Sequence, residues 1–182
     1  AKQPLQEINR SVTPIATVQS EDEQESILFE ALMQAATRGQ TNIACALLSI
    51  GADPRFGEHG SRLSKVSHRI EQKRLFRSNP LHLACLKGDA ILASRLLEKK
   101  DKFNSPDASG LYPLHLAASG TPHAESTVEE DMRRLECVKL LLAVGAPLAM
   151  RDGNKQTVLH CAARAGHCEL LKYVMKTWTD TM

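Results

Sequence analysis

A short pattern recurs along this chain and constrains its fold more than any other feature. Three copies are clear: NPLHLACLKGD at residues 79–89, YPLHLAASG at 112–120 and TVLHCAARAGH at 157–167. A fourth, degenerate copy, LMQAATRGQ, lies earlier in the chain at residues 32–40. Because self-similarity at a fixed spacing is the signature of repeat architectures, the chain is expected to be an array of small units.

The spacing of the copies indicates one constant repeat period and two insertions. The leucines that mark them lie 49, 33 and 45 residues apart: Leu32, Leu81, Leu114 and Leu159. With 33 as the bare period, the first interval carries 16 extra residues, which fall between the first and second units. The third interval carries 12 extra residues, which fall inside the third unit.

These residues resemble the ankyrin repeat, whose TPLH-x-A signature and 33-residue period match the pattern. The resemblance implies an all-α fold, an α-solenoid of about four ankyrin repeats with two insertions. Each unit would be a helix pair that buries its apolar face only by stacking on its neighbours. The expected units are about 27–53, 79–106, 110–148 and 152–178. An aromatic content of 4% fits, because Leu, Ala, Val and Ile must then form the core, and most of these favour helices.

The two ends of the chain are expected to differ. Residues 1–19 show no sustained hydrophobic period and are expected to form an extended or disordered lead, with the repeat domain at 20–182. Ser20 and Glu23 form a capping-box pattern, so the first helix should begin after Ser20. Solenoids usually need a polar capping unit at their ends. Because the sequence shows no such unit after the fourth repeat, the fourth unit is expected to expose apolar side chains. Continuation of the array beyond Met182 and a partner on that face are both open, and the residues concerned are Leu171, Tyr173, Val174 and Trp178.

No pattern in the sequence predicts catalysis, a metal site or a cofactor. The chain contains no P-loop, GxGxxG, GxSxG or HExxH motif, so we expect it not to be an enzyme. Four of the seven histidines stand at repeat positions and are assigned structural roles: His82, His115, His160 and His167. The His-Cys pairs at 160–161 and 167–168 leave a zinc site as an alternative, although their spacing is not that of tetrahedral zinc sites.

Positive charge is concentrated in the first insertion, at about residues 55–78. The whole chain has 23 basic and 21 acidic residues, whereas residues 54–78 have seven basic and two acidic ones, a net charge of +5. The resemblance makes this insertion a finger beside the concave surface, where ankyrin proteins usually bind partners. The partner-binding residues expected in it are Arg62, Lys65, Arg69, Lys73, Arg74 and Arg77. The family's variable contact positions on the concave helices add Arg38, Lys87 and Arg164.

Other interpretations remain open for the two insertions. The basic insertion can also be a solvated loop, a nuclear localisation patch, or a membrane-surface or calmodulin-target helix. The second insertion, at about 120–133, places Thr127 three residues before Glu130, with acidic residues in the turn that follows. This capping pattern predicts a longer second helix in the third unit, at about 128–144, with an additional contact surface as the alternative.

The sequence therefore predicts a non-catalytic protein-protein interaction module that binds an acidic or phosphorylated partner segment. One alternative is a regulatory or targeting domain of a larger enzyme, channel or transcription factor. Another is binding of acidic lipid through the basic insertion. Neither a small-molecule substrate nor nucleic acid is expected. Five cysteines without a C-x-x-C pair predict a reducing compartment, so we expect an intracellular protein, cytoplasmic or nuclear.

Overall fold

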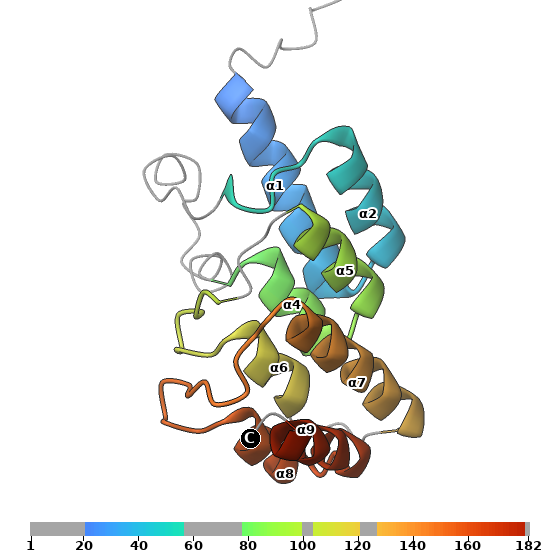
Figure 1. Cartoon of the computed structure of the whole chain (residues 1–182). Helices are drawn as coiled ribbons and strands as arrows, with labels where there is room; N and C mark the ends of the chain where they lie inside the picture. The colour runs from blue at the N-terminus through green and yellow to red at the C-terminus, as the bar shows by residue number, and fades with distance from the viewer. Residues whose placement is uncertain (1–20, 57–77, 100–103, 121–126, 181–182) are drawn as a thin grey trace, which may run out of the picture.

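The computed structural model describes residues 21–56, 78–99, 104–120 and 127–180, and these contain helices and loops but no strand. The helices are α1 (Glu21–Arg38), α2 (Thr41–Ile50), α4 (Pro80–Lys87), α5 (Ala90–Glu98), α6 (Pro113–Ser119), α7 (Val128–Ala143), α8 (Val158–Ala165) and α9 (Cys168–Asp180). Figure 1 shows them following one another along the molecule. The predicted all-α fold is confirmed.

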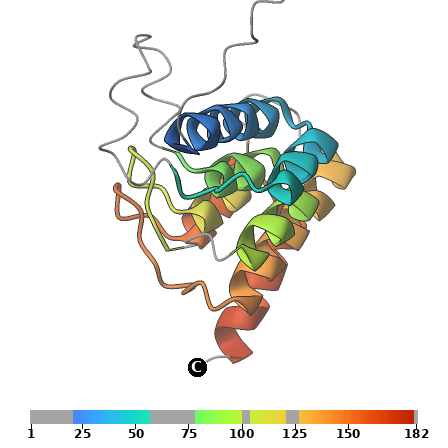
Figure 2. The same cartoon turned by 90° about the horizontal axis from the view of Figure 1, so that it is seen from above.

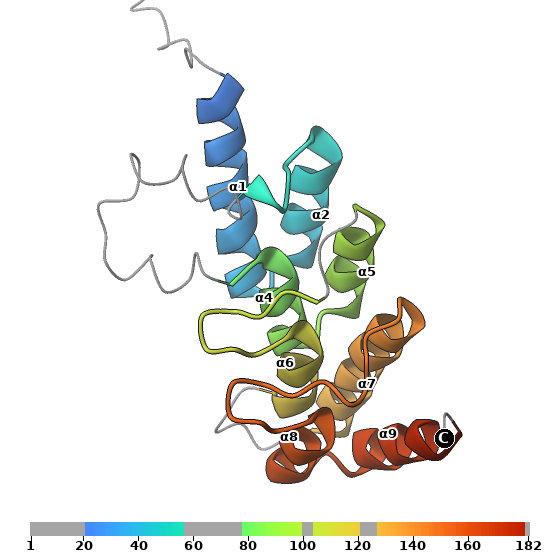
Figure 3. The same cartoon turned by 60° about the vertical axis from the view of Figure 1, so that its left-hand side comes forward.

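The helices form two layers. The first helix of each pair contacts the first helix of the next pair, so that α1, α4, α6 and α8 make an inner layer. In the same way α2, α5, α7 and α9 make an outer layer. Figure 3 shows the two layers as neighbouring columns. Viewed along the array, the loops at 104–112 and 145–157 extend to one side of the helices (Figure 2).

Local sequence explains where the inner helices begin and end. Pro80 and Pro113 occupy the first turns of α4 and α6, where the missing N–H needs no partner. The Asn79 side chain accepts a hydrogen bond from the backbone N–H of His82 at 3.0 Å, which caps α4. Gly88 then ends α4 in the left-handed conformation, with φ of 68°. The repeated pattern therefore carries its own start and stop signals.

The second insertion lengthens α7 as its sequence predicts. This helix has 16 residues, against nine for α5 in the preceding unit. It begins directly after Thr127, whose hydroxyl accepts a hydrogen bond from the backbone N–H of Glu130 at 3.3 Å. Glu129 and Glu130 lie in the first turn, where negative charge interacts favourably with the helix dipole. The extra turns bring α7 into contact with α4 as well as with α5 and α6.

One apolar core runs through the array. Leucines from both layers are fully buried in it, and the alanines Ala84, Ala117 and Ala162 lie on the inner layer with no exposed surface. Small side chains at these positions let neighbouring inner helices approach closely. Val174, which the sequence analysis placed among exposed residues, belongs to this core, because its side chain faces back into the array. That expectation is wrong for Val174, whereas Leu171, Tyr173 and Trp178 are half-buried.

Among the described helices, none is both long and apolar enough to cross a lipid bilayer.

Candidate binding surface

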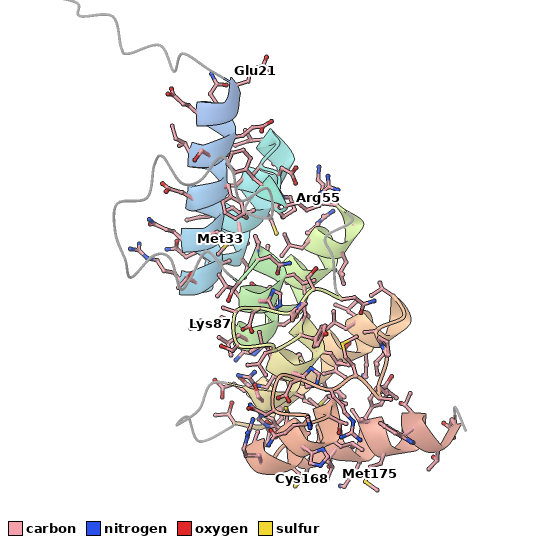
Figure 4. All side chains as sticks on the ribbon, turned by 90° about the vertical axis from the view of Figure 1, so that its left-hand side faces the viewer. Glu21, Met33, Arg55, Lys87, Cys168 and Met175 are labelled. Atoms are coloured by element: carbon pink, nitrogen blue, oxygen red, sulfur yellow. The ribbon has the colours of Figure 1, made fainter. Side chains whose placement is uncertain are left out.

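Three of the predicted partner-binding residues lie at equivalent ends of inner helices. Arg38 is the last residue of α1, Lys87 is the last residue of α4, and Arg164 is the penultimate residue of α8. All three side chains are exposed. Cations at a helix C-terminus interact favourably with the helix dipole, so the positions also suit helix stability. We call these three residues the inner cation row. In Figure 4, Lys87 lies between Met33 and Cys168 along the array.

The other predicted binding residues lie in the basic insertion, outside the described residues, and their role stays a prediction. They are Arg62, Lys65, Arg69, Lys73, Arg74 and Arg77.

Three cations on the outer helices are paired with neighbouring carboxylates. Arg95 in α5 pairs with Glu98 at 3.2 Å, and Lys139 in α7 pairs with Glu136 at 2.7 Å. Lys172 in α9 pairs with Glu169, also at 2.7 Å. Each pair spans three positions of one helix. The outer layer therefore keeps little unbalanced positive charge on these residues.

The inner cation row differs in this respect from Arg95, Lys139 and Lys172. Within the part of the chain that the structure describes, Arg38 and Lys87 make no salt bridge. Arg164 donates a hydrogen bond to the uncharged side-chain oxygen of Gln156 at 3.0 Å. The charges of the row are therefore available to an anionic group outside the described residues.

Arg133 is a further cation at this surface that the sequence analysis did not select. It is exposed on α7, and its Cβ would lie 3.8 Å from a Cβ built on Gly88, the residue that follows Lys87. This proximity depends on the lengthened α7 reaching α4. In the sequence, only the pair Arg133-Arg134 in the second insertion could have indicated this cation, and the pair alone does not show which helix Arg133 lies against.

A buried polar cluster lies beside this surface and joins three units. The Arg134 guanidinium on α7 is 5% exposed and donates to the backbone oxygen of Leu86, at the end of α4, at 3.1 Å. The Nδ1 atom of His167, just before α9, lies 2.5 Å from a carboxylate oxygen of Asp131 on α7. Gly120, after α6, faces both Arg134 and His167. Burial lowers the pKa of Arg134, although neighbouring carboxylates oppose the shift. The cluster fixes the ends of α4, α6 and α9 relative to α7.

The histidines of the repeat pattern occupy structural positions. The Nδ1 atom of His160 accepts a hydrogen bond from the backbone N–H of Thr157 at 3.2 Å, which caps α8. The Nε2 atom of His115 lies 3.1 Å from the backbone oxygen of Gln156, in the loop of the next unit. Burial lowers the pKa of His115 and so favours its neutral form. The structural roles of these two histidines are confirmed.

The zinc alternative has no support among the described side chains. No three His, Cys, Asp or Glu residues in that part of the chain come together as a metal site. Cys161 is fully buried, whereas Cys168 is exposed at the start of α9. Burial raises the pKa of Cys161, and it raises the pKa of Cys137 to about 12, so both thiols stay protonated near neutral pH.

The loops between units are built on aspartate turns. Asp107 accepts hydrogen bonds from the backbone N–H groups of Ser109 and Leu111 at 2.8 and 2.9 Å. Asp152 repeats this arrangement one unit later. The two loops also join directly, because Gly153 donates its N–H to the backbone oxygen of Gly110 at 3.0 Å.

Lys155 holds a strained conformation in the second of these loops, with φ of 62°. Gly110 takes the same place in the preceding loop, where glycine adopts positive φ without strain. We expect Lys155→Gly to raise the free energy of unfolding by about 0.5–1 kcal/mol, since removal of the left-handed strain outweighs the greater chain entropy of glycine. Urea denaturation measures this change. Lys155→Ala keeps the strain, so an equal gain from Lys155→Ala would contradict the explanation.

Comparison with known proteins identifies the repeat. One family model, described as ankyrin repeats in three copies, matches residues 32–130, and a second, described as ankyrin repeats in many copies, matches residues 123–174. The chain is 27% identical over 157 residues to the NF-kappa-B inhibitor delta of Mus musculus, which covers 79% of this chain and 42% of that protein.

Two further relatives are longer still. The chain is 30% identical over 176 residues to the nuclear factor NF-kappa-B p105 subunit of Rattus norvegicus, covering 91% of this chain and 16% of that protein. It is 32% identical over 111 residues to the transient receptor potential cation channel subfamily A member 1 of Homo sapiens, covering 59% of this chain and 9% of the channel. The chain thus spans less than half the length of each of these relatives. The helix pairs, their capping and the matched models together show that the chain belongs to the ankyrin-repeat family.

Proposed function

We propose that this chain is a non-catalytic binding module that takes up an acidic or phosphorylated segment of another protein along its inner layer. Ankyrin repeats generally mediate protein-protein interaction, and the finer assignment rests on the inner cation row. Its members lie at equivalent ends of α1, α4 and α8 and carry charge that no described carboxylate neutralises.

The chemistry of the row suits carboxylate and phosphate groups. A guanidinium presents paired N–H donors that match the two oxygens of such a group, whereas the Lys87 ammonium acts as a point charge. Because the row is carried on stacked helices, the spacing of its backbone positions is set before a partner binds, which reduces the entropy lost on binding. The six basic residues of the first insertion would add to the same field.

Charge reversal tests this proposal directly. The probe is a fluorescein-labelled decapeptide of glutamate, with a neutral glutamine decapeptide as its negative control, measured by anisotropy at low salt. The triple variant Arg38→Glu, Lys87→Glu, Arg164→Glu is expected to weaken binding about tenfold or more, since loss of about 1.4 kcal/mol changes Kd by a factor of ten. Binding that is unchanged in this variant would remove the inner cation row as the site.

The outer layer supplies a matched control for the same charge change. In Arg95→Glu, Lys139→Glu, Lys172→Glu, each substituted cation is exposed or half-exposed and already paired. We expect this variant to retain binding within about threefold, because the decapeptide would meet little unpaired charge there.

A separate variant reverses Arg62, Lys65, Arg69, Lys73 and Arg74. Loss of binding in this variant alone would place the site in the basic insertion.

A second candidate function is a regulatory or targeting domain within a larger protein. The observation that favours it is the length of the relatives, of which this chain covers between 9% and 42%. Two of these relatives are named as an inhibitor and a subunit of NF-kappa-B, and a third as a cation channel. A catalytic or membrane-spanning region in the full-length gene would support this function.

Acidic-lipid binding through the basic insertion is the remaining hypothesis. It requires binding to phosphatidylserine liposomes that falls steeply as salt rises, and no binding to phosphatidylcholine liposomes.

For any of these functions we place the protein inside the cell, in cytoplasm or nucleus. The support is chemical, because all five cysteines are free thiols and three of them are buried in the core.

A further inference from the structure

The end of α4 differs from the ends of the other two helices that carry the inner cation row. For a Cβ built on Gly39, after α1, or on Gly166, after α8, no atom from another part of the described chain lies within 4 Å. A Cβ built on Gly88, after α4, would lie 3.8 Å from the Cβ of Arg133 and 3.3 Å from the Cγ of Arg134. Of these three helix ends, the lengthened α7 therefore packs only against that of α4.

This packing brings two exposed cations to one place. Lys87 directly precedes Gly88 in the chain, and Arg133 lies against Gly88 from α7. Because consecutive Cα atoms are about 3.8 Å apart, the two side chains begin within about 10 Å of each other, and both are long enough to meet at one anionic group. We call Lys87 and Arg133 the cation pair. The inner cation row thus has two positive charges at α4, whereas α1 and α8 each contribute one.

The carboxylates that are nearest in sequence do not neutralise the cation pair. Asp89 caps α5, and its oxygens accept hydrogen bonds from the backbone N–H of Leu92 at 3.0 Å and from a threonine hydroxyl of α2. Glu129 and Glu130 lie one turn before Arg133 on α7, yet the described residues contain no salt bridge to Arg133. The cation pair is therefore open to an anion from outside the described residues.

The buried Arg134 reduces the repulsion that the end of α4 would exert on an anion. The last carbonyl groups of a helix carry partial negative charge. At α4 the backbone N–H of Gly88 donates to two of these oxygens, and Arg134 donates to a third, that of Leu86, at 3.1 Å. The Arg134 guanidinium also adds positive charge beneath the cation pair, although the carboxylates of Glu130 and Asp131 offset part of it. An anion at the cation pair therefore meets carbonyl groups that are already bonded.

Two cations at one place suit an anion with more than one negative charge. A phosphorylated serine or threonine carries a charge of about −1.5 to −2 at neutral pH, against −1 for a carboxylate, and it has three acceptor oxygens. A guanidinium can bind two of these oxygens at once. We propose that Lys87 and Arg133 bind one phosphorylated side chain of a partner segment, while Arg38 and Arg164 interact with carboxylates of the same segment. This inference rests on the proposed function and deepens it, because it assigns the phosphate to one place on the surface.

Two peptides measure the preference of the cation pair for phosphate. The probes are the labelled glutamate decapeptide and the same peptide with phosphoserine at its fifth position, both measured by anisotropy at low salt. We expect the unsubstituted chain to bind the phosphoserine peptide about fivefold more tightly, because the additional charge meets a second exposed cation. Arg133→Gln should reduce this preference to less than about twofold, while Kd for the glutamate decapeptide stays within about threefold.

Arg95→Gln is the matched control, because it makes the same substitution at an exposed arginine of an outer helix. It should keep the fivefold preference for the phosphoserine peptide. Arg133 is exposed, so Arg133→Gln should fold as the unsubstituted chain does, and an unchanged melting temperature checks this.

Three results would overturn the proposal. The first is equal affinity of the unsubstituted chain for the two peptides, and the second is a preference for phosphoserine that Arg133→Gln leaves unchanged. The third is binding to phosphatidic acid vesicles that Arg133→Gln abolishes, because the cation pair would then bind a lipid headgroup. Failure of the proposed function appears in a different measurement, as binding of the glutamate decapeptide that reversal of the inner cation row leaves unchanged.

Discussion

Truncation of Leu114 to alanine is expected to lower the free energy of unfolding by about 2–5 kcal/mol. Leu114 is the second residue of α6 and is 1% exposed. The helix contacts α4, α7 and α8, so the side chain is enclosed by three neighbours that cannot collapse onto the space left behind. Urea denaturation followed by circular dichroism measures the loss, and the slope should show whether the array still unfolds as one unit.

The repeat supplies a matched control for this loss. Leu159 occupies the same place in α8, begins from the same residue type and is only half-buried. We therefore expect Leu159→Ala to cost about 1 kcal/mol, because less apolar area returns to water and solvent fills the gap. An equal cost for the two substitutions would show that burial by the following unit is not what separates them.

Replacement of Gly120 by alanine is expected to destabilise the protein by about 2–4 kcal/mol, through strain at positive φ and through collision with buried side chains. Gly120 has φ of 65°. A Cβ at this position would lie 2.9 Å from the guanidinium carbon of Arg134 and 3.1 Å from Nε2 of His167. Neither group can move freely, because Arg134 holds the Leu86 oxygen and His167 holds Asp131. Thermal unfolding and hydrogen exchange at the start of α9 measure the effect.

Gly166 separates the two causes of this loss. It ends α8 with φ of 77°, and no atom lies within 4 Å of a Cβ built there. Gly166→Ala should therefore show the backbone strain alone, about 1 kcal/mol. A cost for Gly120→Ala no larger than that for Gly166→Ala would refute a steric role for the buried cluster.

The local features of this fold could be predicted from the sequence because the residues that cause them are close neighbours in the chain. Thr127 caps the helix whose third residue is Glu130, and Pro80 begins the helix that Gly88 ends. Such signals need no knowledge of tertiary contacts. The same holds for His160, whose capping partner Thr157 is three residues away.

Features that join separate units could not be predicted in this way. Arg134 meets a carbonyl 48 positions earlier in the chain, and only the lengthened α7 makes that contact. Val174 was expected on the surface because its helix ends the array, but its side chain is fully buried in the core. The inner cation row could be predicted only in part. The repeat register gives the positions of its members, but whether a cation is paired with a carboxylate, as Arg95, Lys139 and Lys172 are, depends on side-chain geometry.

The backbone bond between Gly153 and Gly110 affects how this surface can evolve. Since the two loops are joined through main-chain atoms and each is closed by its own aspartate, their spacing does not depend on the side chains at positions such as Ala108 or Asn154. Those side chains are exposed. Substitutions there should therefore cost little stability, so the exposed surface of these loops can change without loss of the fold.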